Sequence, residues 1–277
     1  MNPDQFKARL KAKLVRLFLS YDENTLLHTL RRLGVSTGDT LMVHASWHQN
    51  NGFLGRPVDF INALKTAVGP EGLLVMTSLT YQNESSKTYL RRMEPMNVRR
   101  SPSRMGLLTE VFRRGRDTVR SLSPTHPLLA WGQRATLFIQ GHDNCLAPFG
   151  PQSPFARLHE WGAKILTVDA PFSTITYTHF IEDRVSATLP FKFYEPEPMT
   201  GIIIDYEGRQ HQIPTLVISD TANGLRREER LVAELEQASL LRATRVGNTK
   251  LLLIDAKAMA DHVDAWTESG GCFFDPA

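Results

Sequence analysis

Short apolar segments alternate with amphipathic segments along most of this chain of 277 residues. Three short runs are rich in apolar residues, as expected of strands buried inside a sheet: residues 40–44, 73–76 and 164–168. Between the first two runs, residues 57–68 carry apolar side chains at helical spacing. Helices and buried strands in alternation indicate a mixed α/β fold, with a sheet covered on both faces.

The same pattern predicts the other elements. Further helices are expected at residues 4–19, 23–33, 106–114, 153–160, 225–237 and 255–266, and further strands at 118–122, 128–132 and 246–254. Ser153 is expected to cap its helix, with Pro154 at the first position. Residues 82–104 carry neither periodicity and are predicted as a long loop. Residues 200–214 read as a hairpin around a Glu207-Gly208 turn.

Composition narrows the class of protein. With 42% hydrophobic and 22% charged residues, the chain is that of an ordinary globular protein, and a net charge of +3 is too small to argue for nucleic acid. No apolar run approaches the ~20 residues of a membrane span, and the N-terminus lacks the apolar core of a signal peptide. Cys145 and Cys272 form no disulfide framework. We therefore expect a cytoplasmic protein that binds neither membrane nor nucleic acid.

One helical segment carries candidate catalytic chemistry. His179 and Glu182 stand three residues apart, on one face of a predicted helix. A neutral imidazole accepts protons at neutral pH, and a carboxylate in hydrogen-bond reach fixes its tautomer. The Ser and Thr residues of segment 173–178 are expected to cap the helix start, so that His179 lies in the first turn. The alternative is a structural ion pair on an amphipathic helix.

A series of short motifs extends this picture. They lie, in order, at residues 38–47, 68–78, 102–106, 110–113, 120–121, 130–132, 142, 149–158 and 176–183. In their order and spacing these segments resemble the aminoglycoside 3-N-acetyltransferase family over roughly residues 35–255. The resemblance implies a three-layer α/β/α sandwich around a mixed sheet, with a smaller C-terminal subregion. It also implies a single domain over residues 1–277, with N-terminal helices (1–35), an acetyl-CoA and catalytic core (36–190), and acceptor-side and C-terminal elements (191–277).

The function that this resemblance implies is acetyl transfer from acetyl-CoA to an amine of an aminoglycoside or related amino sugar. His179 would act as general base, oriented by Glu182, with no metal. Seven residues are expected to contact acetyl-CoA: Val43, His44, Ser46, Thr77, Ser78, Arg120 and Ser121. Three carboxylates are candidates for binding the acceptor: Asp169, Asp183 and Glu195.

The chain departs from the family after the Arg-Ser pair. Many relatives carry His-Pro there, whereas this chain has Ser123-Pro124, with a histidine displaced to His126. Because aminoglycosides are polycations that favour acidic clefts, this departure and the few candidate carboxylates predict weak activity on common aminoglycosides. The competing view is that Glu84 and Glu94 fold over the cleft and restore its acidity.

Two other functions stay open. A zinc-dependent hydrolase would use His44, His126, His142, His179 and Glu182, although no helical His-x-x-x-His pair is present. A catalytically inactive CoA-binding relative is the second alternative, because Ser123 shows that the site has diverged. The oligomeric state also stays open, with a homodimer as one option.

Overall fold

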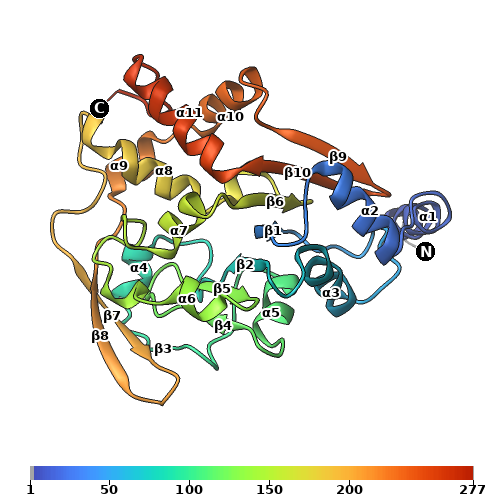
Figure 1. Cartoon of the computed structure of the whole chain (residues 1–277), viewed down its shortest axis with the longest axis horizontal. Helices are drawn as coiled ribbons and strands as arrows, with labels where there is room; N and C mark the ends of the chain where they lie inside the picture. Colours follow the sequence, from blue (N-terminus) through green and yellow to red (C-terminus); the bar gives the residue numbers. More distant parts are fainter. Residues whose placement is uncertain (1–2, 277) are drawn as a thin grey trace.

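A mixed sheet of seven strands forms the middle of the molecule (Figure 1). The computed structural model describes residues 3–276. In spatial order the strands are β4 (Val119–Arg120), β5 (Leu128–Trp131), β2 (Leu73–Thr77), β1 (Thr40–Ala45), β6 (Lys164–Val168), β10 (Thr249–Asp255) and β9 (Arg242–Val246). The central strand β1 runs parallel to β2 and β6, and all other pairings in this sheet are antiparallel. The carboxyl ends of three parallel strands therefore meet at one edge, where loops present functional groups.

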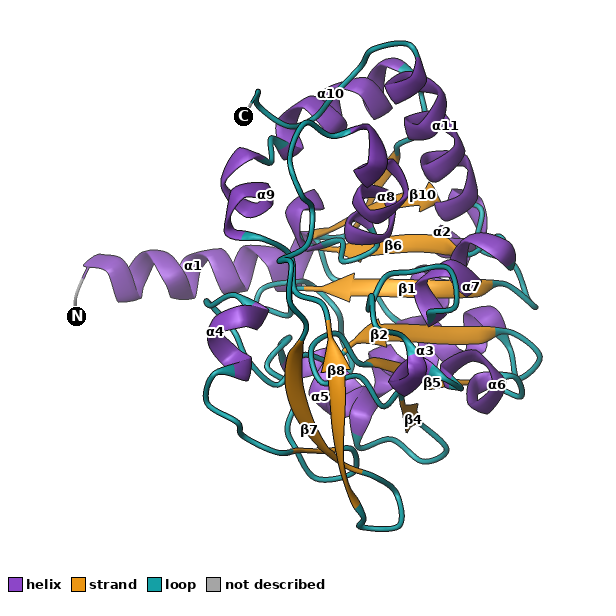
Figure 2. Cartoon of the chain, turned by 90° about the vertical axis from the view of Figure 1, so that its left-hand side faces the viewer, coloured by secondary structure: helices purple, strands orange, loops and turns teal. Residues whose placement is uncertain are grey.

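Helices cover both faces of this sheet (Figure 2). One face packs against α2 (Glu23–Leu33), α3 (Pro57–Val68) and α5 (Leu107–Arg113), and the other against α6 (Ala135–Ile139), α7 (Pro154–Glu160), α8 (Thr178–Val185) and α11 (Ala256–Glu268). In β1, Leu41 and Val43 join the first core while Met42 joins the second, because successive side chains of a strand point to opposite faces. The predicted three-layer sandwich is confirmed.

A second, smaller sheet lies beside the sandwich. It consists of β3 (Met96–Asn97), β7 (Met199–Ile204) and β8 (Gln210–Thr215). The predicted hairpin is confirmed, since β7 and β8 pair antiparallel. The subregion is not purely C-terminal, however, because β3 comes from the segment 82–104 and pairs with β7. That segment also contains α4 (Ser86–Leu90), so its prediction as a loop without regular structure was wrong.

Two further element predictions needed correction. The helix expected at 225–237 is present but begins three residues later, as α10 (Glu228–Gln237), and a separate short helix that was not predicted, α9 (Asp220–Leu225), precedes it. The chain is extended at Arg226, which bridges to Phe274, and the backbone of Arg227 donates to Phe273. The strand expected at 246–254 is the end of β9, a turn and then β10. At that turn Gly247 has φ 52°, and a Cβ there would lie 2.2 Å from the carbonyl oxygen of Leu19, so only glycine fits.

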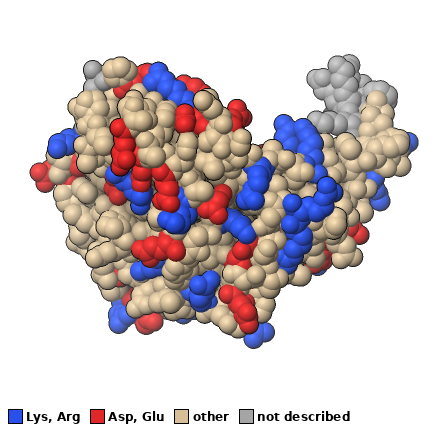
Figure 3. Space-filling model, turned by 45° about the horizontal axis from the view of Figure 1, so that its top comes forward, with Lys and Arg blue, Asp and Glu red and all other residues tan. Residues whose placement is uncertain are grey.

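Charge is distributed unevenly over the molecule. On the face in Figure 3, basic side chains gather mainly toward the end that carries α1 (Pro3–Phe18) and α2, while acidic ones gather toward the other end. Figure 2 shows α1 extending away from the sandwich. Among the helices within residues 3–276, none combines the length and apolar character needed to cross a membrane.

Candidate functional site

The imidazole of His179 and the carboxylate of Glu182 are in contact on α8. His179 Nδ1 lies 2.8 Å from Glu182 Oε2, and Glu182 is fully buried while 22% of the His179 side chain is exposed. Arg226 also contacts this carboxylate: its Nη2 donates to Oε2 at 2.9 Å, and its Nε donates to Oε1. Burial alone would raise the pKa of Glu182, yet the contacts with His179 and Arg226 hold it below its usual range.

The first turn of α8 is built differently from the capping that we predicted. The N-cap residue is Tyr177, and its side chain makes no capping hydrogen bond. Thr178 donates to the carbonyl of Ile175, while Thr176 Oγ1 accepts a hydrogen bond of 3.1 Å from Thr77 Oγ1. This Thr77–Thr176 contact ties the end of β2 to the start of α8. His179 does lie in the first turn, as expected.

The first of two pockets at this edge lies beyond the ends of β1 and β2. It has a volume of about 400 Å³ and is lined by Val43, His44, Ala45, Ser46, Trp47, Thr77, Gln82, Arg104, Met105, Gly106, Leu107, Thr109, Ala170, Pro171 and Thr174. Four of the seven residues predicted to contact acetyl-CoA are therefore together: Val43, His44, Ser46 and Thr77. We call this the β1–β2 pocket.

The second pocket contains the candidate base. It has a volume of about 440 Å³ and is lined by Leu79, Tyr81, Glu84, Ser85, Ser86, His126, His179, Ile218, Asp220, Asn223 and Arg226. Residues 77–82, which are the end of β2 and the segment after it, line both pockets, because Thr77 and Gln82 belong to the first and Leu79 and Tyr81 to the second. His179 lines the second pocket and does not line the first. We call this second cavity the His179 pocket.

Three other histidines near the site are neutral at neutral pH. Burial lowers the pKa of His44 and of His142 to about 4, and it lowers the pKa of His126 well below the usual value. His142 is used internally, with Nδ1 2.8 Å from Ser121 Oγ and Nε2 3.2 Å from the carbonyl oxygen of Pro148. Among residues 3–276, His44 Nε2 and His126 Nδ1 have no hydrogen-bond partner.

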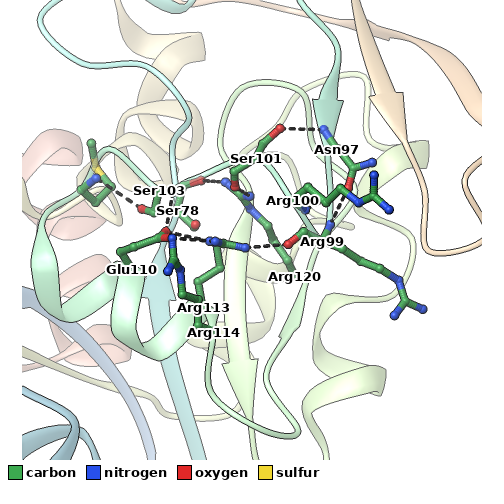
Figure 4. Close-up of polar contacts among 11 residues, drawn as sticks. Ser78, Asn97, Arg99, Arg100, Ser101, Ser103, Glu110, Arg113, Arg114 and Arg120 are labelled. Carbon is green, nitrogen blue, oxygen red and sulfur yellow. Dashed lines mark hydrogen bonds and ion pairs between the residues drawn. The ribbon is translucent and has the colours of Figure 1, made fainter.

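Arg120 and Ser121 lie outside the lining of the β1–β2 pocket and are buried, and Figure 4 shows the contacts of Arg120. Arg120 is 1% exposed; its Nη1 donates to the carbonyl of Ser101 at 2.7 Å, and its Nη2 donates to the carbonyl of Ser78. Ser121 Oγ accepts from the backbone of Leu128 at 2.8 Å. Ser78, also predicted to contact the donor, is fully buried. These three residues are buried and do not line the pocket.

A neighbouring arginine cluster shares the carboxylate of Glu110. Arg113 and Arg114 both donate to it at 2.7 Å, and the backbone of Ser103 donates at 2.9 Å (Figure 4). These contacts, Arg113 first, lower the pKa of Glu110 from 4.5 to about 2. The stabilisation that they provide is therefore present above pH 4.5 and is lost as the pH falls toward 2.

Replacing Glu110 should therefore have a pH-dependent cost. We expect Glu110→Gln to lower the free energy of unfolding by about 1–2 kcal/mol at pH 7, because charge-assisted hydrogen bonds are lost. The difference from the unsubstituted protein should shrink at pH 3, where ionised Glu110 contributes less. Urea denaturation at both pH values measures this, and an undiminished difference at pH 3 would contradict the ion-pair explanation.

The carboxylates predicted to bind the acceptor lie outside the lining of the His179 pocket. Asp169 accepts from the backbone of Lys250 at 2.8 Å and lies 3.2 Å from His48. Asp183 is partly buried, which raises its pKa. Glu195 pairs with Lys87 at 2.8 Å. Ser123, at the departure from the family pattern, is buried and accepts from the backbone of His126 at 3.2 Å.

Three residues of the His179 pocket carry charges that were not among our predicted site residues. They are Glu84, Asp220 and Arg226. Glu84 was considered as a lid carboxylate, and it does line the pocket. No local motif marks Asp220 or Arg226, since both reach the site through tertiary contacts of α9. Among residues 3–276, no three His, Cys, Asp or Glu side chains are arranged to hold a metal ion.

Comparisons with known proteins agree with this architecture. The sequence profile described as aminoglycoside 3-N-acetyltransferase matches residues 42–268. The chain is 28% identical over 266 residues to aminoglycoside N(3)-acetyltransferase VII of Streptomyces paromomycinus, covering 88% of this chain and 90% of that protein. It is 30% identical over 177 residues to aminoglycoside N(3)-acetyltransferase VIII of Streptomyces fradiae, covering 58% of this chain and 60% of that protein.

A solved structure shows the same likeness in three dimensions. The structure of AAC-IIIb in binary complex with CoASH superposes with a TM-score of 0.72 at 25% identity, covering 93% of this chain and 99% of that one. The profile match spans most of the chain and includes the His179–Glu182 pair. This chain therefore belongs to the aminoglycoside 3-N-acetyltransferase family of acyltransferases.

Proposed function

We propose that this protein transfers an acetyl group from acetyl-CoA to an amine of an aminoglycoside or related amino sugar. The observation that carries the proposal is the His179–Glu182 pair at 2.8 Å, with His179 in one of two pockets that share the segment 77–82 and are each large enough for part of a substrate. Thiol release from acetyl-CoA, measured with a panel of amino-sugar and aminoglycoside acceptors, tests it. Absence of acceptor-dependent thiol release across the panel would favour the inactive CoA-binding alternative.

The β1–β2 pocket has the chemistry that an acyl-CoA donor requires. His44 Nε2, buried and without a partner among residues 3–276, lines this pocket and would hydrogen-bond a ligand there. Ser46 and Arg104 are exposed at its rim, where a hydroxyl and a guanidinium suit the polar arm and the phosphates of the donor. When bound, acetyl-CoA supplies an activated thioester carbonyl.

The acceptor amine would enter the His179 pocket. An ammonium group is not a nucleophile, so a base must remove a proton from it. His179 would accept this proton at Nε2, because Nδ1 is engaged with Glu182. Glu182 would fix the tautomer and stabilise the imidazolium that forms. The buried histidines His44 and His126 would stay neutral throughout, since burial lowers the pKa of both.

The charges of the His179 pocket favour an acceptor of low charge. Both carboxylates that line it carry a cationic partner: Lys87 Nζ lies 2.6 Å from Asp220, and Arg92 Nη1 lies 2.5 Å from Glu84. A polycationic aminoglycoside would have to compete with these cations for the carboxylates. We therefore expect a small amino sugar to be a better acceptor than kanamycin or gentamicin.

Removing the cationic partner of one carboxylate should strengthen the binding of a polycationic acceptor selectively. We expect Arg92→Gln, which frees Glu84, to lower the Michaelis constant for kanamycin by about fivefold at low salt, or about 1 kcal/mol. The constant for a monoamine sugar should not change, and added salt should remove the gain. Steady-state kinetics at two salt concentrations measure this. The matched control is Arg116→Gln, because Arg116 is exposed and pairs with its neighbour Asp117.

Two results would contradict this explanation of acceptor choice. One is efficient acetylation of kanamycin by the unsubstituted protein, with a Michaelis constant that rises steeply as salt is added. The other is an equal gain with Arg116→Gln, which would indicate a general charge effect.

A further inference from the structure

Arg226 pairs with Glu182 from outside α8. Its guanidinium donates two hydrogen bonds to Glu182, from Nε to Oε1 and from Nη2 to Oε2. The Arg226 side chain is 13% exposed and Glu182 is fully buried, so this ion pair is shielded from solvent. A two-pronged contact of this kind fixes the plane of the carboxylate as well as its charge.

The position of Arg226 is imposed by the break between α9 and α10. The backbone N–H of Arg226 donates to the carbonyl of Ala222 at 3.2 Å, and Arg226 forms an isolated antiparallel β-bridge with Phe274 near the C-terminus. Nη1 donates to Asn223 Oδ1 at 3.1 Å, which leaves Nε and Nη2 directed at Glu182. The break between α9 and α10 therefore places the guanidinium of Arg226 against Glu182.

Glu182 needs this partner for a physical reason. A carboxylate in a fully buried position is destabilised as an anion unless it is paired and hydrogen-bonded. The imidazole of His179 contacts only Oε2, so Oε1 depends on Arg226. A protonated Glu182 could donate to Nδ1 of His179, and this would leave the proton on Nε2, where the base must be empty.

We infer that Arg226 is a positioning residue of the proposed acyl transfer: it keeps Glu182 ionised and aligned, so that Glu182 accepts the Nδ1 proton of His179 and Nε2 is left as the base. This inference rests on the function proposed above. Arg226 acts through Glu182, and it contributes nothing to the donor pocket, whose lining does not include it.

Kinetics of matched variants test whether Arg226 acts through Glu182. We expect Arg226→Ala to lower kcat about tenfold, with an unchanged Michaelis constant for acetyl-CoA, and Arg226→Lys to lower it less. The double variant Arg226→Ala/Glu182→Gln should have a kcat no lower than that of Glu182→Gln alone, because both substitutions remove the same Arg226–Glu182 interaction. Arg227→Ala is the control, since Arg227 pairs with Asp275 and donates to the carbonyls of Gly224 and Arg226.

A second measurement does not need turnover. In proton NMR, the Nδ1 proton of His179 should give a strongly deshielded resonance in the unsubstituted protein and in Arg227→Ala, and this resonance should be lost in Arg226→Ala. Should Arg226→Ala fold poorly, Arg226→Lys is expected to shift the resonance. An unchanged Nδ1 resonance in both Arg226 variants would overturn the inference. A double variant whose kcat falls by the product of the two single effects would overturn it as well. If no acceptor supports turnover, the proposed function fails while the NMR result still decides the role of Arg226.

Discussion

His179→Ala is expected to lower kcat by about 10²-fold to 10⁴-fold, the range for loss of a general base. The reason is that His179 is the one histidine of its pocket with both a carboxylate partner and solvent access, since His126 is buried and its pKa is lowered. Affinity for CoA should stay nearly unchanged, because His179 does not line the β1–β2 pocket. Thiol-release kinetics and calorimetry of CoA binding measure the two quantities. Glu182→Gln should lower kcat somewhat less.

The matched control is another histidine with a carboxylate partner. His262 Nε2 lies 2.8 Å from Glu234 Oε1, between α11 and α10, and neither residue lines either pocket. His262→Ala should leave kcat within about twofold of the unsubstituted value. Equal activity of the His179→Ala and unsubstituted proteins would end the proposed mechanism. A parallel loss in His262→Ala would indicate damage to folding instead.

Ser46→Trp should raise the Michaelis constant for acetyl-CoA by about 10²-fold, because an indole would fill part of a pocket of about 400 Å³ and overlap the donor. Ser46 is the better site for this test because it is exposed, whereas Thr77 is 3% exposed and a Trp there would disrupt the core as well. The Michaelis constant for the acceptor should change little. Initial rates over a grid of both substrate concentrations separate the two constants.

A reciprocal variant provides the control. Ser86 begins α4 and lines the His179 pocket. Ser86→Trp should therefore raise the Michaelis constant for the acceptor and spare that for acetyl-CoA, the opposite of Ser46→Trp. If Ser46→Trp keeps normal acetyl-CoA kinetics, the β1–β2 pocket is not the donor site, and if the two variants behave alike, the pockets are not separate.

Local sequence patterns were sufficient to predict most helices and strands of the sandwich. Apolar periodicity located β1, β2, β6 and the helices that cover them, because burial against a sheet is recorded in the spacing of apolar residues. Periodicity failed where tertiary contacts override it. The extended backbone at Arg226 pairs with Phe274, and so α10 begins at Glu228 rather than at the predicted residue 225. Short elements such as α4 and β3 carry too few residues to show a period.

The sequence by itself determined the His179–Glu182 contact and four of the residues that line the β1–β2 pocket. His179 and Glu182 share a helix face at a spacing of three residues, so their contact follows from helix geometry alone. Val43, His44, Ser46 and Thr77 meet because adjacent parallel strands end at one edge. In contrast, Arg226 lies 44 residues from Glu182, and Lys87 lies 133 residues from Asp220. Only the tertiary structure decided those ion pairs and the burial of Arg120. The spacing of apolar residues shows which face of a helix or strand is buried, but it does not show which polar side chains from distant parts of the sequence come into contact.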